Sequence, residues 1–292
     1  MTTIDYFILI AFISALGNVV NSLLVAGATK KNIYNSQTCV VYSILPIFII
    51  SIFIVLINSI KIEINVFLLL CVKNVIYGLG FYLRFKAVEK LGAFNGALMA
   101  ASQPVMISIF SLVFLSELLN TVQWVAILSV SIAILIPVRK NSYSIKDIAS
   151  YVALPTLLFS STVIFDRYLL TTYLSPTDFF VWDKISVFPA VLVSLFIAGK
   201  LKNISLKPTG KVFTVKVILL MTLLGLSWGI ASYTYAIALA GEKAAIVTMI
   251  RNLAFPLTAL AGAYIFKEKI DRIQYISLTI IVVAIVCGTI FG

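Results

Sequence analysis

Six long stretches of this sequence contain no charged residue. Each runs for 20 residues or more, and an α-helix needs about 20 apolar residues to cross the hydrocarbon core of a bilayer. They lie at residues 6–29, 32–60, 91–116, 118–138, 217–241 and 273–292. Since 61% of all residues are hydrophobic and only 11% are charged, a soluble domain could not hide this apolar surface. The sequence therefore predicts an all-α integral membrane protein embedded in the lipid bilayer.

Four further stretches are equally apolar but contain charges. They lie at residues 64–85, 148–172, 177–199 and 244–266. Their charged residues are Lys73, Arg84, Asp166, Arg167, Asp178, Asp183, Lys184 and Arg251. With the six uncharged stretches they give ten predicted transmembrane helices, joined by short links.

The net charge of +11 comes from basic residues that gather in alternate links. Sixteen Lys and Arg residues fall in links after odd-numbered helices, and two fall in links after even-numbered helices. By the positive-inside rule the odd-numbered links face the cytoplasm and both termini lie outside. We expect a multi-pass protein of the cell inner or plasma membrane. A nucleic-acid-binding surface would not segregate in this way, so no nucleic-acid partner is expected.

The residues that most often serve in catalysis and metal binding are scarce. The chain has no histidine, and Cys39, Cys71 and Cys287 are scattered without the spacing of metal ligands. Neither a metal, nor a cofactor, nor a catalytic site is therefore predicted. A membrane-embedded enzyme becomes a weak hypothesis.

A motif from the first half of the chain recurs in the second. "ELLNTVQW" at 117–124 matches "EKIDRIQY" at 268–275, at a separation of 151 residues. Each glutamate follows an apolar helix with a proline and precedes a Gln–aromatic pair. Five helices per copy is an odd number, so the second copy is inserted upside down, as in secondary transporters. We expect a 5+5 inverted repeat with halves 1–140 and 141–292, in which Glu117 and Glu268 cap the helices that follow them.

Two longer segments point to a known family. "FKAVEKLGAFNGALMAASQPVMISIFSLVFLSELLNTVQW" and "YAIALAGEKAAIVTMIRNLAFPLTALAGAYIFKEKIDRIQY" each contain a helix end, a proline-containing helix and a closing glutamate. In this the chain resembles the ten-helix EamA-type carriers of the drug/metabolite transporter superfamily, in both halves. The resemblance implies a carrier with a central cavity that moves a small metabolite by alternating access. It also implies that helices 1, 3, 4, 6, 8 and 9 line most of this cavity.

Two of the cations inside the predicted helices have no acidic neighbour in their own helix. Arg251 comes eight residues after Lys243 and Lys73 ten residues after Glu63, which places Arg251 about 12 Å below the helix end and Lys73 at a similar depth. Charges at such depth are functional candidates by default. Because guanidinium and ammonium groups bind carboxylates and phosphates, we expect Arg251 and Lys73 to contact an anionic group of the substrate.

The charges of the sixth and seventh helices have a simpler interpretation. Asp166, Asp178 and Asp183 can neutralise Arg167 and Lys184, as the membrane interior demands. We therefore expect structural ion pairs at these positions.

Uncharged polar residues punctuate the helices that the resemblance assigns to the cavity. They are Asn18, Asn21, Asn74, Asn95, Ser102, Gln103, Ser227, Ser232 and Asn252. Gln103 precedes Pro104, and Asn252 lies one turn before Pro256, so each region can also offer a freed backbone carbonyl. We place Asn18, Asn21, Asn74, Gln103 and Asn252 in the candidate substrate site. Hydrogen bonds between helices are the alternative for each.

Aromatic residues and glycines cluster in the third, fourth and eighth helices. Trp228, Tyr77 and Tyr235, with Tyr82, could form a cage for a quaternary amine, although most such rings serve packing. We include the first three in the candidate site. The small-residue pairs Gly92–Gly96 and Gly225–Gly229 predict close helix packing within the monomer, with a dimer face as the alternative.

Together these features favour a secondary transporter of a small polar metabolite that bears a carboxylate or phosphate. A carrier of a cation such as choline, bound by aromatic rings, is the first alternative. A membrane scaffold or enzyme without a transport cycle is the alternative from another class. A coupling proton or sodium ion, and a monomer or homodimer, are all compatible with the sequence.

Overall fold

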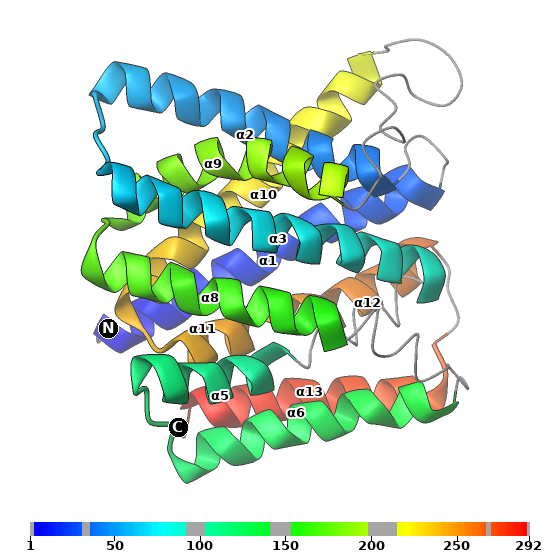
Figure 1. Cartoon of the computed structure of the whole chain (residues 1–292). Coiled ribbons are helices and arrows are strands. Elements are labelled where there is room, and N and C mark those ends of the chain that lie inside the picture. The colour runs from blue at the N-terminus through cyan, green and yellow to red at the C-terminus, as the bar shows by residue number, and fades with distance from the viewer. Residues whose placement is uncertain are drawn as a thin grey trace.

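A computed structural model describes residues 3–30, 36–91, 103–140, 153–197, 215–266 and 270–290, which form a bundle of helices (Figure 1). The helices are α1 Thr3–Lys30, α2 Ser36–Asn58, α3 Ile64–Leu91, α5 Gln103–Leu115, α6 Thr121–Lys140, α8 Leu154–Thr172, α9 Pro176–Ile197, α10 Val215–Gly241, α11 Ala244–Arg251, α12 Ala254–Phe266 and α13 Arg272–Ile290. No strand occurs in these segments. The predicted all-α class is confirmed.

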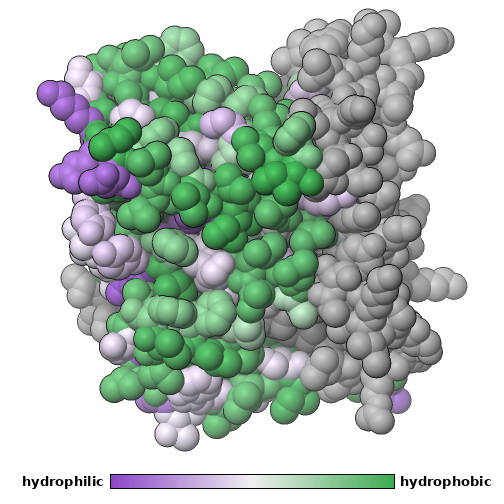
Figure 2. Space-filling model, in the orientation of Figure 1, coloured by the Kyte–Doolittle hydropathy of each residue, from purple (hydrophilic) through white to green (hydrophobic). Residues whose placement is uncertain are grey.

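Many of the helices have the length and composition of membrane spans. Within the described segments, seven spans qualify, with α11 and α12 counted together as the span Ala244–Ile265. Large apolar side chains cover the outside: Leu56 is 71% exposed and Ile57 77% exposed, and a hydrophobic surface dominates the visible described face (Figure 2). Such a surface suits lipid rather than water, so the chain is a multi-pass membrane protein. The count of ten helices stays a prediction.

Short turns gather at one face of the bundle. The turns between α2 and α3, α5 and α6, α8 and α9, and α10 and α11 all lie on the left in Figure 1, with the start of α1 and the end of α13. The closest neighbours come from opposite halves of the chain: α1 packs on α10, α3 on α9, and α6 on α13. The centre of the bundle is therefore built jointly by the two halves.

Two glycines permit a further contact between the halves, that of α10 with α2. A Cβ on Gly225 would lie 2.6 Å from Cβ of Pro46, and a Cβ on Gly229 would lie 2.5 Å from Cδ1 of Ile47. The predicted close packing at this pair is thus confirmed, between α10 and α2. The pair Gly92–Gly96 lies outside the described residues.

The two copies of the repeated motif begin their helices in the same way. The backbone N–H of Gln123 donates to Asn120 Oδ1 (2.9 Å), while that of Asn120 donates to Gln123 Oε1 (3.0 Å). Asp271 and Gln274 form the same reciprocal pair at the start of α13, with distances of 2.8 and 2.9 Å. These are capping boxes, which satisfy backbone donors at a helix start.

Glu117 does not cap α6, so that expectation was wrong. Ser116 adopts a left-handed conformation (φ 54°), and the N–H of Glu117 donates back to the carbonyl of Ser111 (3.1 Å), a C-terminal cap of α5. This turn directs the carboxylate away from α6. Its Oε2 instead accepts from the backbone N–H of Ala244, the first residue of α11 (3.0 Å). Glu268 lies outside the described residues.

Candidate functional site

The ninth predicted helix is broken where its arginine lies. α11 ends at Arg251 and α12 begins at Ala254. Between them the backbone N–H of Asn252 donates to the carbonyl of Thr248 (2.9 Å), and the backbone N–H of Leu253 donates to the carbonyl of Ile250 (3.0 Å). The last turn of α11 is therefore tighter than the rest. Pro256 contributes to the break, because it has no N–H to donate to the carbonyl one turn upstream. Discontinuous helices mark the binding sites of many secondary transporters.

A small cavity of about 50 Å³ lies beside this break. It is lined by residues of α3, α5, α8, α9, α10 and α11. The resemblance placed helix 1 in the cavity wall. Instead, the wall includes α9, the seventh predicted helix, because α9 packs directly on α3. This helix contributes Phe179, Phe180, Asp183 and Lys184. The volume suffices for a few water molecules.

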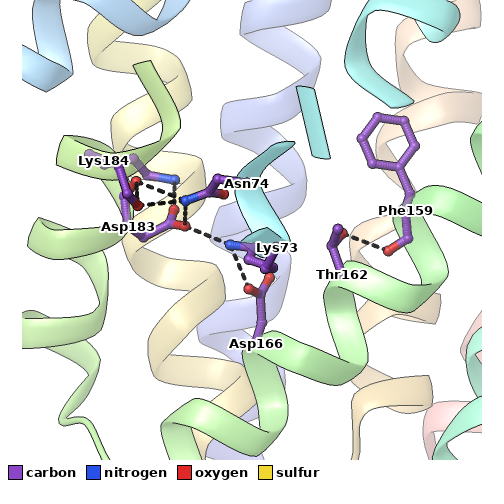
Figure 3. Close-up of polar contacts among 8 residues, drawn as sticks. Lys73, Asn74, Phe159, Thr162, Asp166, Asp183 and Lys184 are labelled. Atoms are coloured by element: carbon purple, nitrogen blue, oxygen red, sulfur yellow. Dashed lines mark hydrogen bonds and ion pairs between the residues drawn. The ribbon is translucent and has the colours of Figure 1, made fainter. Parts of the chain in front are cut away.

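Lys73 is paired, which corrects the expectation of an unpartnered cation. Its Nζ lies 2.7 Å from Asp166 Oδ1 on α8 and 2.6 Å from Asp183 Oδ1 on α9 (Figure 3). Its side chain is only 3% exposed. One ammonium group thus joins three helices. The partners escape a search within one helix because they come from elements distant in sequence.

Lys184 completes this charge cluster. Its Nζ lies 2.6 Å from Asp183 Oδ2, as expected for a structural pair. The same ammonium lies 4.1 Å from the ring centroid of Trp228, a cation–π contact. Asn74 donates to Asp183 Oδ1 (3.0 Å) and to Ser186 Oγ (2.7 Å). Trp228, proposed as part of a substrate cage, therefore contacts a cation of the protein itself.

The other expected pairs do not form. Arg167 Nε lies 2.9 Å from Glu117 Oε1 rather than beside Asp166. Asp178 Oδ2 accepts from Ser175 Oγ (2.7 Å), and the Asp178 N–H donates to the same hydroxyl, near the start of α9. Asp178 therefore helps to begin a helix and does not neutralise Lys184.

Arg251 differs from the two lysines. Within the described segments no carboxylate lies within ion-pair distance of its guanidinium, and its buried Nε has no hydrogen-bond partner. The guanidinium carbon lies 4.3 Å from the ring centroid of Tyr235. The ring compensates part of the charge, but the donor at Nε stays unused.

The remaining candidate residues fall into two groups. Asn74, Tyr77, Gln103 and Tyr235 line the cavity together with Lys73 and Arg251, and so does Ser232. Asn252 is buried (3% exposed), and its Nδ2 has no hydrogen-bond partner.

The second group lies away from the cavity wall. Asn21 donates to the carbonyl of Leu224 (2.9 Å) and lies 3.3 Å from Ser227 Oγ, which is packing between α1 and α10. Asn18 is half-buried on α1, and Tyr82 is buried in an apolar cluster without lining the cavity. Asn95 and Ser102 lie outside the described residues.

Comparisons with known proteins agree with this architecture. One protein of known crystal structure superposes with a TM-score of 0.73 over 98% of this chain and 99% of that chain, at 15% identity, which shows a shared fold. No curated protein matches the sequence. The family model described as the EamA-like transporter family matches residues 2–139 and again 148–289. Since these two matches cover nearly the whole chain, the protein belongs to the EamA-like transporter family, within the drug/metabolite transporters.

Proposed function

We propose that this protein is a secondary transporter of a small polar metabolite that bears a carboxylate or phosphate. The chain would form ten transmembrane helices in two inverted repeats, 1–140 and 141–292, with the odd-numbered links in the cytoplasm. The cavity at the junction of the halves would open to each side in turn. Its small volume fits a cycle in which substrate enters when the helices separate.

The observation that carries this proposal is the state of Arg251. Its guanidinium lies on the cavity wall, has no carboxylate partner in the described segments, and retains a buried Nε donor without an acceptor. An unpaired charge inside a membrane protein is costly unless it faces a ligand or water. A carboxylate or phosphate of the substrate would supply the missing partner, with two parallel hydrogen bonds to the guanidinium.

The cation alternative receives less support from the same geometry. Tyr235 faces Arg251 at 4.3 Å, Trp228 faces Lys184 at 4.1 Å, and Tyr77 lies 6.0 Å from Lys73 Nζ. These rings already contact cations of the protein, which would repel a quaternary amine. A scaffold would give no reason for an arginine that lies beside a central cavity without a carboxylate partner among the described residues.

Binding by Arg251 variants tests the proposal. Metabolites that stabilise the purified protein in a thermal-shift screen would be titrated against wild type, Arg251→Lys and Arg251→Ala. Loss of the planar fork should weaken binding in Arg251→Lys, and loss of the charged hydrogen bonds in Arg251→Ala should cost about 1.5–3 kcal/mol. Arg272→Ala is the matched control, because Arg272 is exposed at the start of α13.

Uptake of the same metabolites into proteoliposomes tests transport itself. Accumulation by wild type and by Arg272→Ala, but not by Arg251→Ala, would support the proposal. Unchanged affinity in a folded Arg251→Ala variant would refute the anion site. Uptake of no metabolite by a stable preparation would favour the scaffold.

A further inference from the structure

The lysines and aspartates of the cavity form an electrically neutral group of four. Lys73 contacts Asp166 and Asp183, and Lys184 contacts the second oxygen of Asp183 (Figure 3). Two ammonium groups therefore face two carboxylates at 2.6–2.7 Å. All four residues are buried, with exposures of 8% or less. We call Lys73, Asp166, Asp183 and Lys184 the charge quartet.

Arg251 is the charge that the quartet does not balance. It is the remaining charged residue among those that line the cavity in the described segments. Arg84, the next cation along α3, is 11 residues beyond Lys73, about 16 Å along the helix axis. It is not among the described residues that line the cavity, although its charge interacts with that of Arg251. The described residues that line the cavity thus carry a net charge of one positive unit, located at Arg251.

The net charge of these residues determines which substrate leaves the occupied cavity neutral. A substrate with one negative charge cancels the charge of Arg251. A dianion would leave one negative charge, and a zwitterion would leave one positive charge, in a site removed from water. Uncompensated charge in such a site is strongly disfavoured. A phosphate monoester carries a charge of about −1.5 to −2 near neutral pH, so a carboxylate fits better.

The uncharged part of the wall indicates the body of the substrate. Tyr77, Phe159, Phe179, Phe180 and Tyr235 contribute five rings to the lining. Tyr77 and Phe159 pack edge to face at 5.5 Å between centroids. Rings of this kind favour flat apolar groups through stacked or edge-to-face contacts.

We propose that the carrier selects a monocarboxylate with a single negative charge and a flat, aromatic body. This inference rests on the proposed function and narrows it. Arg251 binds the carboxylate, the quartet keeps the rest of the wall neutral, and the rings contact the body. Lys184 and Asp183 thereby become specificity residues without contacting the carboxylate.

Four probes that share one ring test the charge requirement. Calorimetric titration of the purified protein at neutral pH would compare benzoate, phthalate, phenylalanine and benzyltrimethylammonium. We expect benzoate to bind at least tenfold more tightly than the dianion, the zwitterion or the cation. The inference is overturned if any of the other three probes binds as tightly as benzoate or more tightly. It is also overturned if none of the four probes binds.

Charge changes in the quartet should then move the preference. Lys184→Gln brings the wall to zero and should favour phenylalanine over benzoate. Asp183→Asn brings it to two positive units and should favour phthalate. Because Asp183 contacts both lysines, Lys184→Gln serves as the decisive variant if Asp183→Asn does not fold. The control Lys61→Gln alters an exposed charge outside the cavity and should leave the ranking unchanged.

The two proposals fail separately in these experiments. If the ranking does not respond to Lys184→Gln while Arg251→Ala still abolishes anion binding, the charge requirement is wrong and the anion carrier stands. If proteoliposomes accumulate a dianion or a zwitterion and Arg251→Ala abolishes that uptake, the charge requirement is likewise wrong and the proposed carrier function stands. If Arg251→Ala changes nothing, the proposed function itself is wrong.

Discussion

Arg167 and Glu117 form an ion pair, with 2.9 Å between Nε and Oε1, that joins α8 to the turn after α5. Both side chains are largely buried, at 16% and 11% exposure. Arg167 Nη1 also donates to the carbonyl of Leu239, and Glu117 Oε2 accepts from the N–H of Ala244. One pair thus connects both halves of the chain, at the end of α10 and the start of α11.

Neutralising Glu117 should therefore lower stability. Glu117→Gln keeps the size of the side chain but removes the charge that Arg167 and the start of α11 both contact. We expect a loss of about 1.5–3 kcal/mol in the free energy of unfolding, as for a hydrogen bond to a charged group. Denaturant unfolding in detergent measures it. The control Glu63→Gln alters an exposed glutamate and should have little effect.

The same variant separates a structural role from a functional one. Arg167 and Glu117 are not among the residues that line the central cavity in the described segments. The ranking of substrates should therefore be the same in Glu117→Gln and in wild type. A selective change in that ranking would contradict the structural role.

Removing Lys73 should destabilise the fold. Lys73→Met leaves Asp166 without its ammonium partner, and it leaves Lys184 as the remaining ammonium partner of Asp183. Breaking a buried ion pair on one side costs about 3–5 kcal/mol, because a charge stays buried without compensation. The sequence alone predicts an unpaired lysine, and the removal of an unpaired lysine should leave the protein folded.

A double variant tests whether this loss comes from the ion pair. Lys73→Met combined with Asp166→Asn removes one charge of each sign, so part of the lost stability should return. Thermal unfolding of the four proteins gives the coupling free energy. Strictly additive losses would show that Lys73 and Asp166 do not stabilise each other.

The contrast between Lys73 and Arg251 shows what sequence reasoning can reach. A charge inside a long apolar run is visible in one helix, so both residues could be identified as candidates from the sequence. Their partners could not be identified, because Asp183 is 110 residues from Lys73 and the contact of α3 with α9 leaves no local pattern. The prediction that Glu117 caps α6 failed for another reason. The direction of its side chain depends on the positive φ of Ser116, a conformation that serine rarely adopts.

The glycine pair of α10 was easier, since only small residues allow helices to approach so closely. Gly225→Ala should cost about 1–3 kcal/mol, because the new methyl group meets the rigid ring of Pro46. Gly229→Ala should cost less, since the end of the Ile47 side chain can rotate away. Gly27→Ala is the control, with no atom within 4 Å of the added Cβ. Thermal unfolding of the three variants should rank them in this order.

The inverted repeat makes a prediction about sidedness. Leu118 and Lys269 occupy equivalent positions of the repeated motif, 151 residues apart. If the second copy is inserted upside down, these positions lie on opposite faces of the membrane. From the distribution of basic residues we expect Leu118 to face outward and Lys269 to face the cytoplasm.

Cysteine labelling distinguishes the arrangements. In a background with Cys39, Cys71 and Cys287 replaced by alanine, an impermeant thiol reagent should modify Leu118→Cys in intact cells. Lys269→Cys should react only after the membrane is permeabilised. The reverse result would turn the orientation over while preserving the repeat, because the two sites would still lie on opposite faces. Labelling of both from outside would refute the inversion, since an odd number of spans per repeat always separates equivalent positions.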